Sequence, residues 1–408
     1  MPIITVFSGI FCKEGPVIRE VLDRVGYKLV TTEAIVAEAS RLSGMSENKI
    51  ARAFAAKTSV FNKFTHEREH SIAWLKLALS GKLSEDNLLI SGFAGQLVPR
   101  EISHVLRVCL IANLRFRISV AAQEQGLSEK DARKLIRVRD ADCAAWVKTI
   151  FGVKDPWNVS LYDIVIATDK RSIKEAATLI DENVNKDVLK PTEASRRQVE
   201  DFHLAARVEV ALGKEGHDVR VSARDGSVTL TINKHVLMLN RLEQELKSIA
   251  TRVKGVKSVV TKVGKEYYKT DIYRKYDFEV PSKVLLVDDE REFVETLSER
   301  LLMRHMGAAV AYDGESALNL VREDEPEVMI LDLRMPGIDG IEVLRRVKET
   351  RPDIEVIILT GHGSEADRKI CMDLGAFAYL QKPVDIDLLS DTLKKANEKI
   401  RRKKVAKG

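Results

Sequence analysis

A short apolar run that ends in one carboxylate constrains the fold of this chain more than any other stretch. Residues 328–331 read Val-Met-Ile-Leu, Asp332 follows them directly, and a Met-Pro-Gly turn begins at Met335. Four to six apolar residues closed by a turn are typical of a buried parallel strand. The pattern therefore places Asp332 at the carboxyl end of a strand, where open α/β sheets bind their ligands.

Three more apolar runs of the C-terminal region end in polar residues. They are residues 284–287 before Asp288 and Asp289, residues 356–359 before Thr360, and residues 378–380 shortly before Lys382. Carboxylates that cluster at one sheet edge raise one another's pKa unless a cation lies among them, and a hard oxygen cluster suits Mg²⁺. We therefore expect a site for phosphoryl transfer onto Asp332, driven by positioning and charge neutralisation.

Residues 283–402 resemble the receiver domain of bacterial response regulators, which implies a flavodoxin-like (βα)5 fold. The resemblance implies that Asp332 is the phosphoacceptor and that the switch and phosphoryl-binding residues are Thr360, Tyr379 and Lys382. It also implies a Mg²⁺ site made by Asp288, Asp289, Asp332 and the backbone carbonyl of Arg334. The implied partner is a sensor histidine kinase or a phosphotransfer protein. An unrelated flavodoxin-like domain with acidic strand ends is the alternative.

Length and composition favour a soluble multidomain α/β protein. A chain of 408 residues suggests two to four domains, and 45% hydrophobic with 31% charged residues is ordinary for globular proteins. The net charge of +5 does not by itself indicate a nucleic-acid partner. The sequence contains neither a run of ~20 apolar residues nor a signal peptide, so we expect a cytoplasmic location. The four cysteines lack CxxC spacing and predict neither zinc nor a disulfide framework.

The N-terminus predicts a strand, a glycine-containing loop and a helix, which is the place of a phosphate-binding P-loop. Residues 3–7 are the strand, and Gly9 and Gly15 enclose five loop residues. A working P-loop has four residues between glycines and then Lys-Ser/Thr. Here Pro16 occupies the place of the lysine, and only Lys13 could reach a phosphate. The nucleotide signal is therefore weak.

Residues 1–185 resemble the cytidylate kinase-like family, a P-loop-kinase-like parallel α/β fold. The resemblance rests on Gly26-Tyr27-Lys28, on residues 126–136 and on residues 160–169. It places lid and phosphate-facing groups at Arg117, Arg137, Arg139 and Asp140, of which the three arginines could equally be solvated helix-face charges.

Three positions of that family's nucleotide site have changed. Besides the P-loop, the usual Asp-Arg after the second strand is Thr31-Thr32, and the usual Gly-Arg-Gly after the third is Gly92-Phe93-Ala94. We therefore expect a non-catalytic domain. The alternative is an active cytidylate-type nucleoside monophosphate kinase that binds ATP and CMP and is regulated by phosphorylation of Asp332.

The middle of the chain predicts a small α+β domain at residues 199–266, after a linker at 186–198. A helix is followed by two alternating strands around Asp225-Gly226, a strong hairpin signal, and then by a helix and a third strand. The segment resembles the BON domain, which implies binding rather than catalysis. A spacer or a homodimerisation unit is favoured over a lipid or ligand site.

A second linker at 267–282 interleaves aromatic and basic residues, and residues 403–408 form a basic tail. The aromatic residues could stack on single-stranded nucleic acid, but packing of a connector is favoured. No helix-turn-helix follows the receiver-like segment, so a DNA-binding transcription factor is disfavoured. The sequence as a whole predicts a response regulator that relays phosphorylation of Asp332 to its N-terminal domain.

Overall fold

The computed structural model describes residues 2–236, 238–265, 267, 280–304, 306–361 and 363–407. The chain divides into two compact units, one made of residues 1–58 and 67–273 and the other of residues 59–66 and 274–408. Residues 268–279 of the predicted second linker, Gly408 and the side chains of residues 404–407 in the predicted tail lie outside the described residues. Among the described residues, no helix has the length and apolarity that crossing a bilayer requires.

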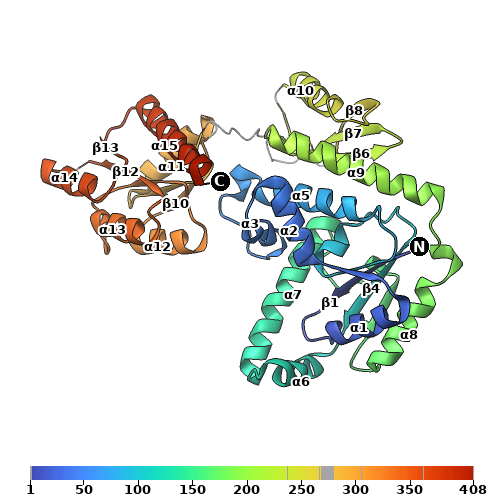
Figure 1. Ribbon diagram of the computed structural model, residues 1–408. Coiled ribbons are helices and arrows are strands. Elements are labelled where there is room, and N and C mark those ends of the chain that lie inside the picture. Colours follow the sequence, from blue (N-terminus) through green and yellow to red (C-terminus); the bar gives the residue numbers. More distant parts are fainter. Residues whose placement is uncertain are drawn as a thin grey trace. The chain divides into compact units, whose positions relative to one another are not determined.

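The first unit contains a parallel five-stranded sheet in the order β2-β3-β1-β4-β5, of which β1 and β4 are labelled in Figure 1. Its strands are β1 Ile3–Ser8, β2 Lys28–Thr31, β3 Leu88–Ser91, β4 Val105–Ile111 and β5 Ile164–Ala167 (Figure 1). The central strand β1 is buried on both faces, as a mainly apolar and β-branched run requires in a sheet that is covered on both sides. The predicted parallel α/β fold of the N-terminal region is confirmed.

Helices cover both faces of this sheet. On one face pack α1 Glu14–Val25 and α8 Ile173–Val184. On the other face pack α2 Thr32–Ser43, α5 Glu67–Lys82 and α7 Glu129–Phe151. Helix α6 Leu114–Gln125 contacts α7 and leads into it. Short helical segments complete the unit at α3 Glu47–Ala51, η1 Arg52–Phe54, η2 Phe93–Leu97, η3 Val159–Leu161 and η4 Asp187–Leu189.

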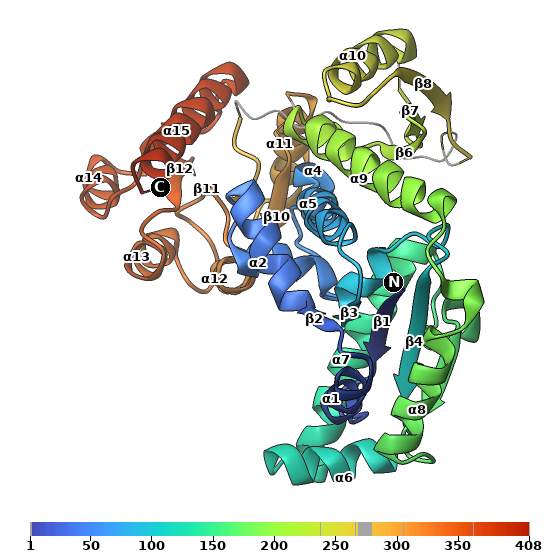
Figure 2. The same cartoon turned by 45° about the vertical axis from the view of Figure 1, so that its right-hand side comes forward.

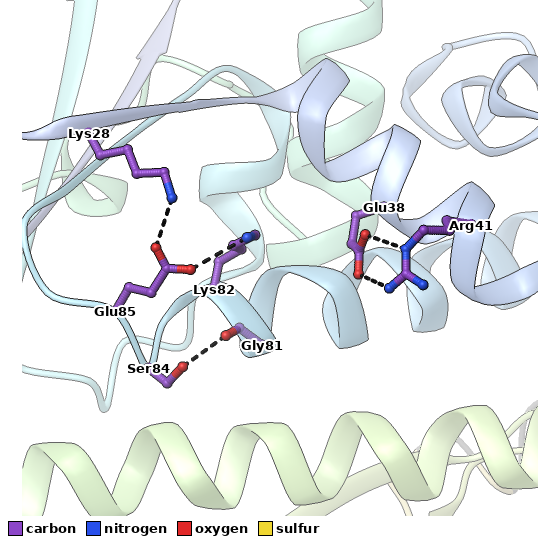
Figure 3. A network of polar contacts seen from close by, with 7 residues as sticks. All are labelled: Lys28, Glu38, Arg41, Gly81, Lys82, Ser84 and Glu85. Atoms are coloured by element: carbon purple, nitrogen blue, oxygen red, sulfur yellow. Dashed lines mark hydrogen bonds and ion pairs between the residues drawn. The ribbon is translucent and has the colours of Figure 1, made fainter.

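Exposed polar contacts join β2 to the end of α5. The ammonium groups of Lys28 and Lys82 lie 3.0 Å and 3.4 Å from the two carboxylate oxygens of Glu85 (Figure 3). The hydrogen bond from Lys28 lowers the pKa of Glu85. Exposed pairs of this kind contribute at most about 1 kcal/mol, so the buried core, and not this network, fixes the position of β2.

The middle region forms a three-stranded sheet in the order β6-β7-β8 that packs on two helices (Figure 2). Its elements are α9 Glu193–Lys214, β6 Arg220–Arg224, β7 Ser227–Ile232, α10 Leu239–Thr251 and β8 Ser258–Val263. The predicted order of helix, hairpin, helix and strand is confirmed. Asp225 and Gly226 have φ values of 50° and 87°, which the two central residues of a type I′ turn require.

Helix α9 begins at Glu193, earlier than the sequence pattern predicts. Thr192 and Ser195 form a capping box, in which each side chain bonds the backbone N–H of the other residue. Because these caps satisfy donors at the helix start, the helix includes residues that we assigned to the linker at 186–198.

The second unit contains the other parallel five-stranded sheet, in the order β10-β9-β11-β12-β13. Its strands are β9 Val284–Val287, β10 Ala308–Ala311, β11 Val328–Leu331, β12 Glu355–Thr360 and β13 Ala378–Gln381. One face packs against α12 Gly314–Glu323, α13 Gly340–Thr350 and α14 Glu365–Asp373, and the other against α11 Arg291–Met303 and α15 Ile386–Lys407. This arrangement confirms the predicted flavodoxin-like (βα)5 fold.

Residues 59–66 also belong to the second unit. They include the short helix α4 Asn62–Thr65. Both the Ser59 hydroxyl and the Val60 N–H donate to one carboxylate oxygen of Asp324, at 2.6 Å and 2.9 Å. Phe61 is fully buried and joins the core beneath α12 and α13.

Candidate functional site

The carboxyl ends of β9, β11, β12 and β13 form one edge of the second sheet and carry the predicted site residues. Leu331 pairs with Val287 on one side and with Ile358 on the other, so the residues that follow these strands are neighbours. One oxygen from each of Asp288, Asp289 and Asp332 lies within 4.8 Å of the others. The fold therefore brings Asp332 next to the adjacent pair Asp288 and Asp289, from which it is far apart in the sequence.

Lys382 lies among these carboxylates. Its Nζ is 2.7 Å from Asp288 Oδ2 and 3.9 Å from Asp332 Oδ2. Burial raises the pKa of Asp288 and the nearby Asp332 adds to the rise, while the hydrogen bond from Lys382 opposes both effects. Burial acts to lower the pKa of Lys382, but its hydrogen bonds to Asp288 and Glu290 raise it overall. The ammonium therefore stays charged and offsets part of the repulsion between the carboxylates.

Asp332 presents an oxygen that no described residue binds. The residue is only 5% exposed, and its Oδ1 is buried without a hydrogen-bond partner among the described residues. A buried carboxylate oxygen without a partner is costly unless a ligand completes it. Three carboxylates supply oxygen ligands here, and the single positive charge of Lys382 does not neutralise them. These residues therefore fit a hard divalent cation such as Mg²⁺.

The remaining predicted residues surround the same edge. Thr360 ends β12 and is fully buried. The Tyr379 hydroxyl is buried without a partner among the described residues, and burial raises its pKa. Arg334 and Asp289 line a cavity of about 440 Å³ beside the carboxylates. The Lys382–Pro383 peptide bond is cis.

Three residues near the site were not predicted from the sequence. Glu290 lies 3.0 Å from Lys382 Nζ, and the Phe293 ring centroid lies 4.4 Å from the same nitrogen. A Cβ on Gly363 would overlap the Tyr379 hydroxyl. Glu290 directly follows the acidic pair, so its position could have singled it out; Gly363 gave no such signal.

A buried arginine of the same domain contacts the N-terminal loop. Arg117 is buried and donates to the Ile10 carbonyl at 2.8 Å and to both carboxylate oxygens of Asp140 at 2.9 Å and 2.7 Å. Its guanidinium lies close to Gly9, because a Cβ there would be 3.4 Å away. The buried Arg117 guanidinium is therefore paired with groups of the protein itself, at the loop backbone and at Asp140.

Two loop residues adopt the left-handed conformation that L side chains rarely adopt. Phe11 has φ 63° and Lys13 has φ 55°, at a cost of roughly 1–2 kcal/mol each. Phe11 is held by a small apolar cluster with residues of α6 and α7. The Lys13 ammonium lies 5.2 Å from the centre of the Phe116 ring.

The other predicted nucleotide residues do not converge on the loop. Gly15 is exposed in the first turn of α1. Arg137 is exposed on α7, and Arg139 pairs with Asp142 at 3.6 Å on the same helix. Of the basic residues predicted for this site, only Arg117 directly contacts the loop backbone.

The start of α1 carries an acid where a phosphate-binding helix accepts an anion. Glu14 is the first residue of α1. Burial and the nearby Glu33 raise its pKa to about 7. A second negative group here would be repelled, in contrast to helix N-termini that bind phosphates.

Two models of known protein families match separate segments of the chain. The model of the response regulator receiver domain matches residues 284–394. The model of the cytidylate kinase-like family matches residues 3–170. Both predicted resemblances are thereby confirmed, and the BON resemblance of the middle region stays a prediction.

Curated relatives match through the C-terminal region. Response regulator MprA of Mycolicibacterium vanbaalenii is 36% identical over 110 residues, which cover 27% of this chain and 48% of the relative. Response regulator MprA of Mycobacterium avium is 36% identical over 107 residues, covering 26% and 47%. The chain spans about half the length of the curated relatives it matches.

Solved receiver domains give partial matches. A response regulator receiver domain protein from Clostridium thermocellum is 34% identical and covers 30% of this chain and 98% of its own, with a TM-score of 0.29. A CheY-like receiver domain protein from Methanospirillum hungatei is 22% identical and covers 29% and 96%, with a TM-score of 0.29. From its sequence and its sheet, the chain contains a C-terminal response regulator receiver domain and an N-terminal domain of the cytidylate kinase-like family.

Proposed function

We propose that this protein is a two-component response regulator in which Asp332 accepts a phosphoryl group. The observation that carries the proposal is the state of the Asp332 carboxylate. One oxygen is buried without a described partner, and the other lies 3.9 Å from the Lys382 ammonium. A nucleophile that is held between a cation and an unsatisfied position is prepared for a transfer in which positioning and charge dominate.

In the proposed step, a carboxylate oxygen of Asp332 attacks the phosphorus of a phosphohistidine. The donor is a sensor histidine kinase or a phosphotransfer protein. The new P–O bond forms as the P–N bond breaks, and the bond's electron pair goes to the imidazole nitrogen, which takes up a proton from solvent. Lys382 lies close enough to hydrogen-bond a phosphoryl oxygen after a small movement, and the Thr360 hydroxyl at the end of β12 can donate to another.

Magnesium is the proposed cofactor of this step. Asp288, Asp289, Asp332 and the backbone carbonyl of Arg334 would hold it, and it would neutralise charge on the carboxylate and the phosphoryl group. The response that follows is proposed to pass through Thr360 and Tyr379, because the buried Tyr379 hydroxyl lies close to Thr360.

We further propose that the cytidylate kinase-like domain receives this signal and does not turn over nucleotide. Arg117 donates to the backbone of the loop that would cradle phosphates, Phe11 of that loop packs against α6 and α7, and Glu14 places an acid at the start of α1. Thr32 replaces a nucleotide-facing residue of the family; its hydroxyl donates to the Ser91 carbonyl and accepts from the Ala94 N–H. These contacts stabilise the fold in place of a ligand.

Acetyl phosphate with Mg²⁺, followed by intact-mass measurement, tests the receiver assignment. Wild type and the matched control Asp373→Asn, an exposed acid on α14, should each gain one phosphoryl group. Asp332→Asn should gain none. If Asp332→Asn is phosphorylated as wild type is, Asp332 is not the phosphoacceptor.

An assay with ATP and CMP tests the N-terminal domain. We expect no ADP above the no-enzyme background, with and without prior phosphorylation of Asp332. Turnover that disappears in Lys13→Ala would instead establish an active kinase and contradict the non-catalytic assignment.

A further inference from the structure

The sheet of the middle region has one face buried on helices and one face directed away from them. Val228, Leu230 and Ile232 of β7 pack against α9 and α10. Side chains alternate along a strand, and the strand register therefore places nine residues on the opposite face: Arg220, Ser222, Arg224, Ser227, Thr229, Thr231, Ser258, Val260 and Lys262. We call this set the outer sheet face.

The outer sheet face contains three cations and no acid. All six of its residues on the edge strands β6 and β8 are exposed. Within the described part of the chain, neither an ion pair nor a side-chain hydrogen bond engages Arg220, Arg224 or Lys262. Five of the remaining six residues carry hydroxyl groups, so the face is formed almost entirely of hydrogen-bond donors.

Positive charge is concentrated in the same region of the chain. Residues 214–265 contain eleven Lys or Arg and five Asp or Glu, which gives a net charge of +6. The whole chain has a net charge of +5, so all other residues together carry −1. A local excess of this kind indicates an anionic partner, which a net charge spread evenly along the chain would not.

The residue types on the face distinguish among anionic partners. Binding to a membrane surface uses apolar side chains that enter the lipid, and here only Val260 could do so. Single-stranded nucleic acid is bound by aromatic side chains that stack on bases, and the face has none. Arg, Lys, Ser and Thr are the side chains that contact phosphates of duplex DNA.

We propose that the outer sheet face binds the phosphate backbone of duplex DNA without reading its sequence. Arg220 and Lys262 lie at one end of the face, on either side of Thr231, and Arg224 lies at the other end beside Ser227. Cations at both ends with hydroxyl groups between them can contact successive phosphates. Three phosphate contacts give a slope of log K against log salt of about −2.7, because each contributes about −0.9.

Fluorescence anisotropy with the full-length protein and a labelled random-sequence duplex of about 24 base pairs tests the proposal. The triple variant R220Q/R224Q/K262Q should bind at least ten-fold more weakly at low salt, and its salt slope should be smaller in magnitude by about 2.7. The matched control is R115Q/K130Q/K134Q, which removes the same charge from exposed positions of α6 and α7. It should bind as wild type does.

Equal binding by the two triple variants would overturn the proposal, as would the absence of duplex binding by wild type at low salt. Tighter binding of wild type to phosphatidylglycerol vesicles, to an RNA duplex or to a polyglutamate peptide than to the DNA would overturn it as well. Circular dichroism of both triple variants confirms that any loss of affinity is not a loss of fold.

Discussion

Lys382 Nζ lies 3.0 Å from a carboxylate oxygen of Glu290, a residue whose side chain is 65% exposed. Glu290 therefore shares the one ammonium of the site with Asp288 and Asp332. In the proposed reaction the incoming phosphoryl group binds that ammonium, so Glu290 competes with it. Exposed ion pairs are worth at most about 1 kcal/mol, which makes the competition mild and reversible.

Glu290→Gln should accordingly speed phosphorylation of Asp332 by acetyl phosphate. We expect a rate increase of about two- to five-fold, because up to about 1 kcal/mol of competition is removed. The time course of phosphorylation by intact mass measures it. Glu315→Gln, an exposed acid of α12 in the same domain, is the control and should leave the rate unchanged. A slower Glu290→Gln would mean that Glu290 assists the reaction.

Magnesium should stabilise the receiver domain and leave the first unit unaffected. A cation that binds only the folded site at ten times its Kd adds about 1.4 kcal/mol. In calorimetry, the transition of the second unit should move to higher temperature. All three tryptophans, Trp74, Trp146 and Trp157, lie in the first unit, so tryptophan fluorescence should report no change. A stabilisation that persists in Asp289→Asn and in Asp332→Asn would place the cation elsewhere.

Gly363→Ala should move Tyr379 out of its buried position. The added methyl group would overlap the Tyr379 hydroxyl and lie 2.9 Å from a methyl carbon of Thr360. Rotation of the tyrosine is the least costly response, since its hydroxyl is the far end of a side chain. Because burial raises the Tyr379 pKa, exposure should return it toward the ordinary value.

The Tyr379 pKa can be followed with ¹⁹F-labelled tyrosine, with the resonance assigned by Tyr379→Phe. Gly361→Ala is the matched control, because a Cβ there meets only ordinary contacts at 3.9 Å from Lys382. Only Gly363→Ala should lower the pKa. An unchanged titration in both variants would show that the tyrosine does not depend on the glycine.

Glu14→Gln should stabilise the first unit at pH 8 and remove part of its pH dependence. The pKa of Glu14 is raised from 4.5 to about 7 by burial and by Glu33. The folded state therefore binds more protons than the unfolded state between these values, and stability falls as pH rises through that window. Removal of the charge should add roughly 1–3 kcal/mol at pH 8 and little at pH 4.

Urea unfolding followed by tryptophan fluorescence measures the effect of Glu14→Gln. Glu124→Gln, an exposed residue of α6, is the control and should not alter the pH profile. Equal stability of wild type and Glu14→Gln at pH 8 would show that the Glu14 carboxylate is well solvated.

The receiver fold and the residues at its strand ends were predictable because local sequence patterns indicate both. Apolar runs that end in polar residues marked strands β9, β11 and β12, and the Asp225-Gly226 pair marked the middle hairpin. The start of α9 was predicted too late, because the Thr192–Ser195 capping box outweighed the irregular composition around it. Residues 59–66 gave no signal that they belong to the second unit, since their contacts with Asp324 join positions far apart in the sequence.

The sequence by itself determined which residue types end each strand, and so the chemistry that Asp332 can perform. It also determined that the N-terminal loop lacks the lysine of a P-loop. Only the tertiary structure decided that Arg117 binds the backbone of that loop, that Glu290 shares Lys382, and that three cations and five hydroxyls lie on one sheet face. Strand ends are set by local periodicity, whereas these contacts depend on register and packing between distant segments, which no local pattern encodes.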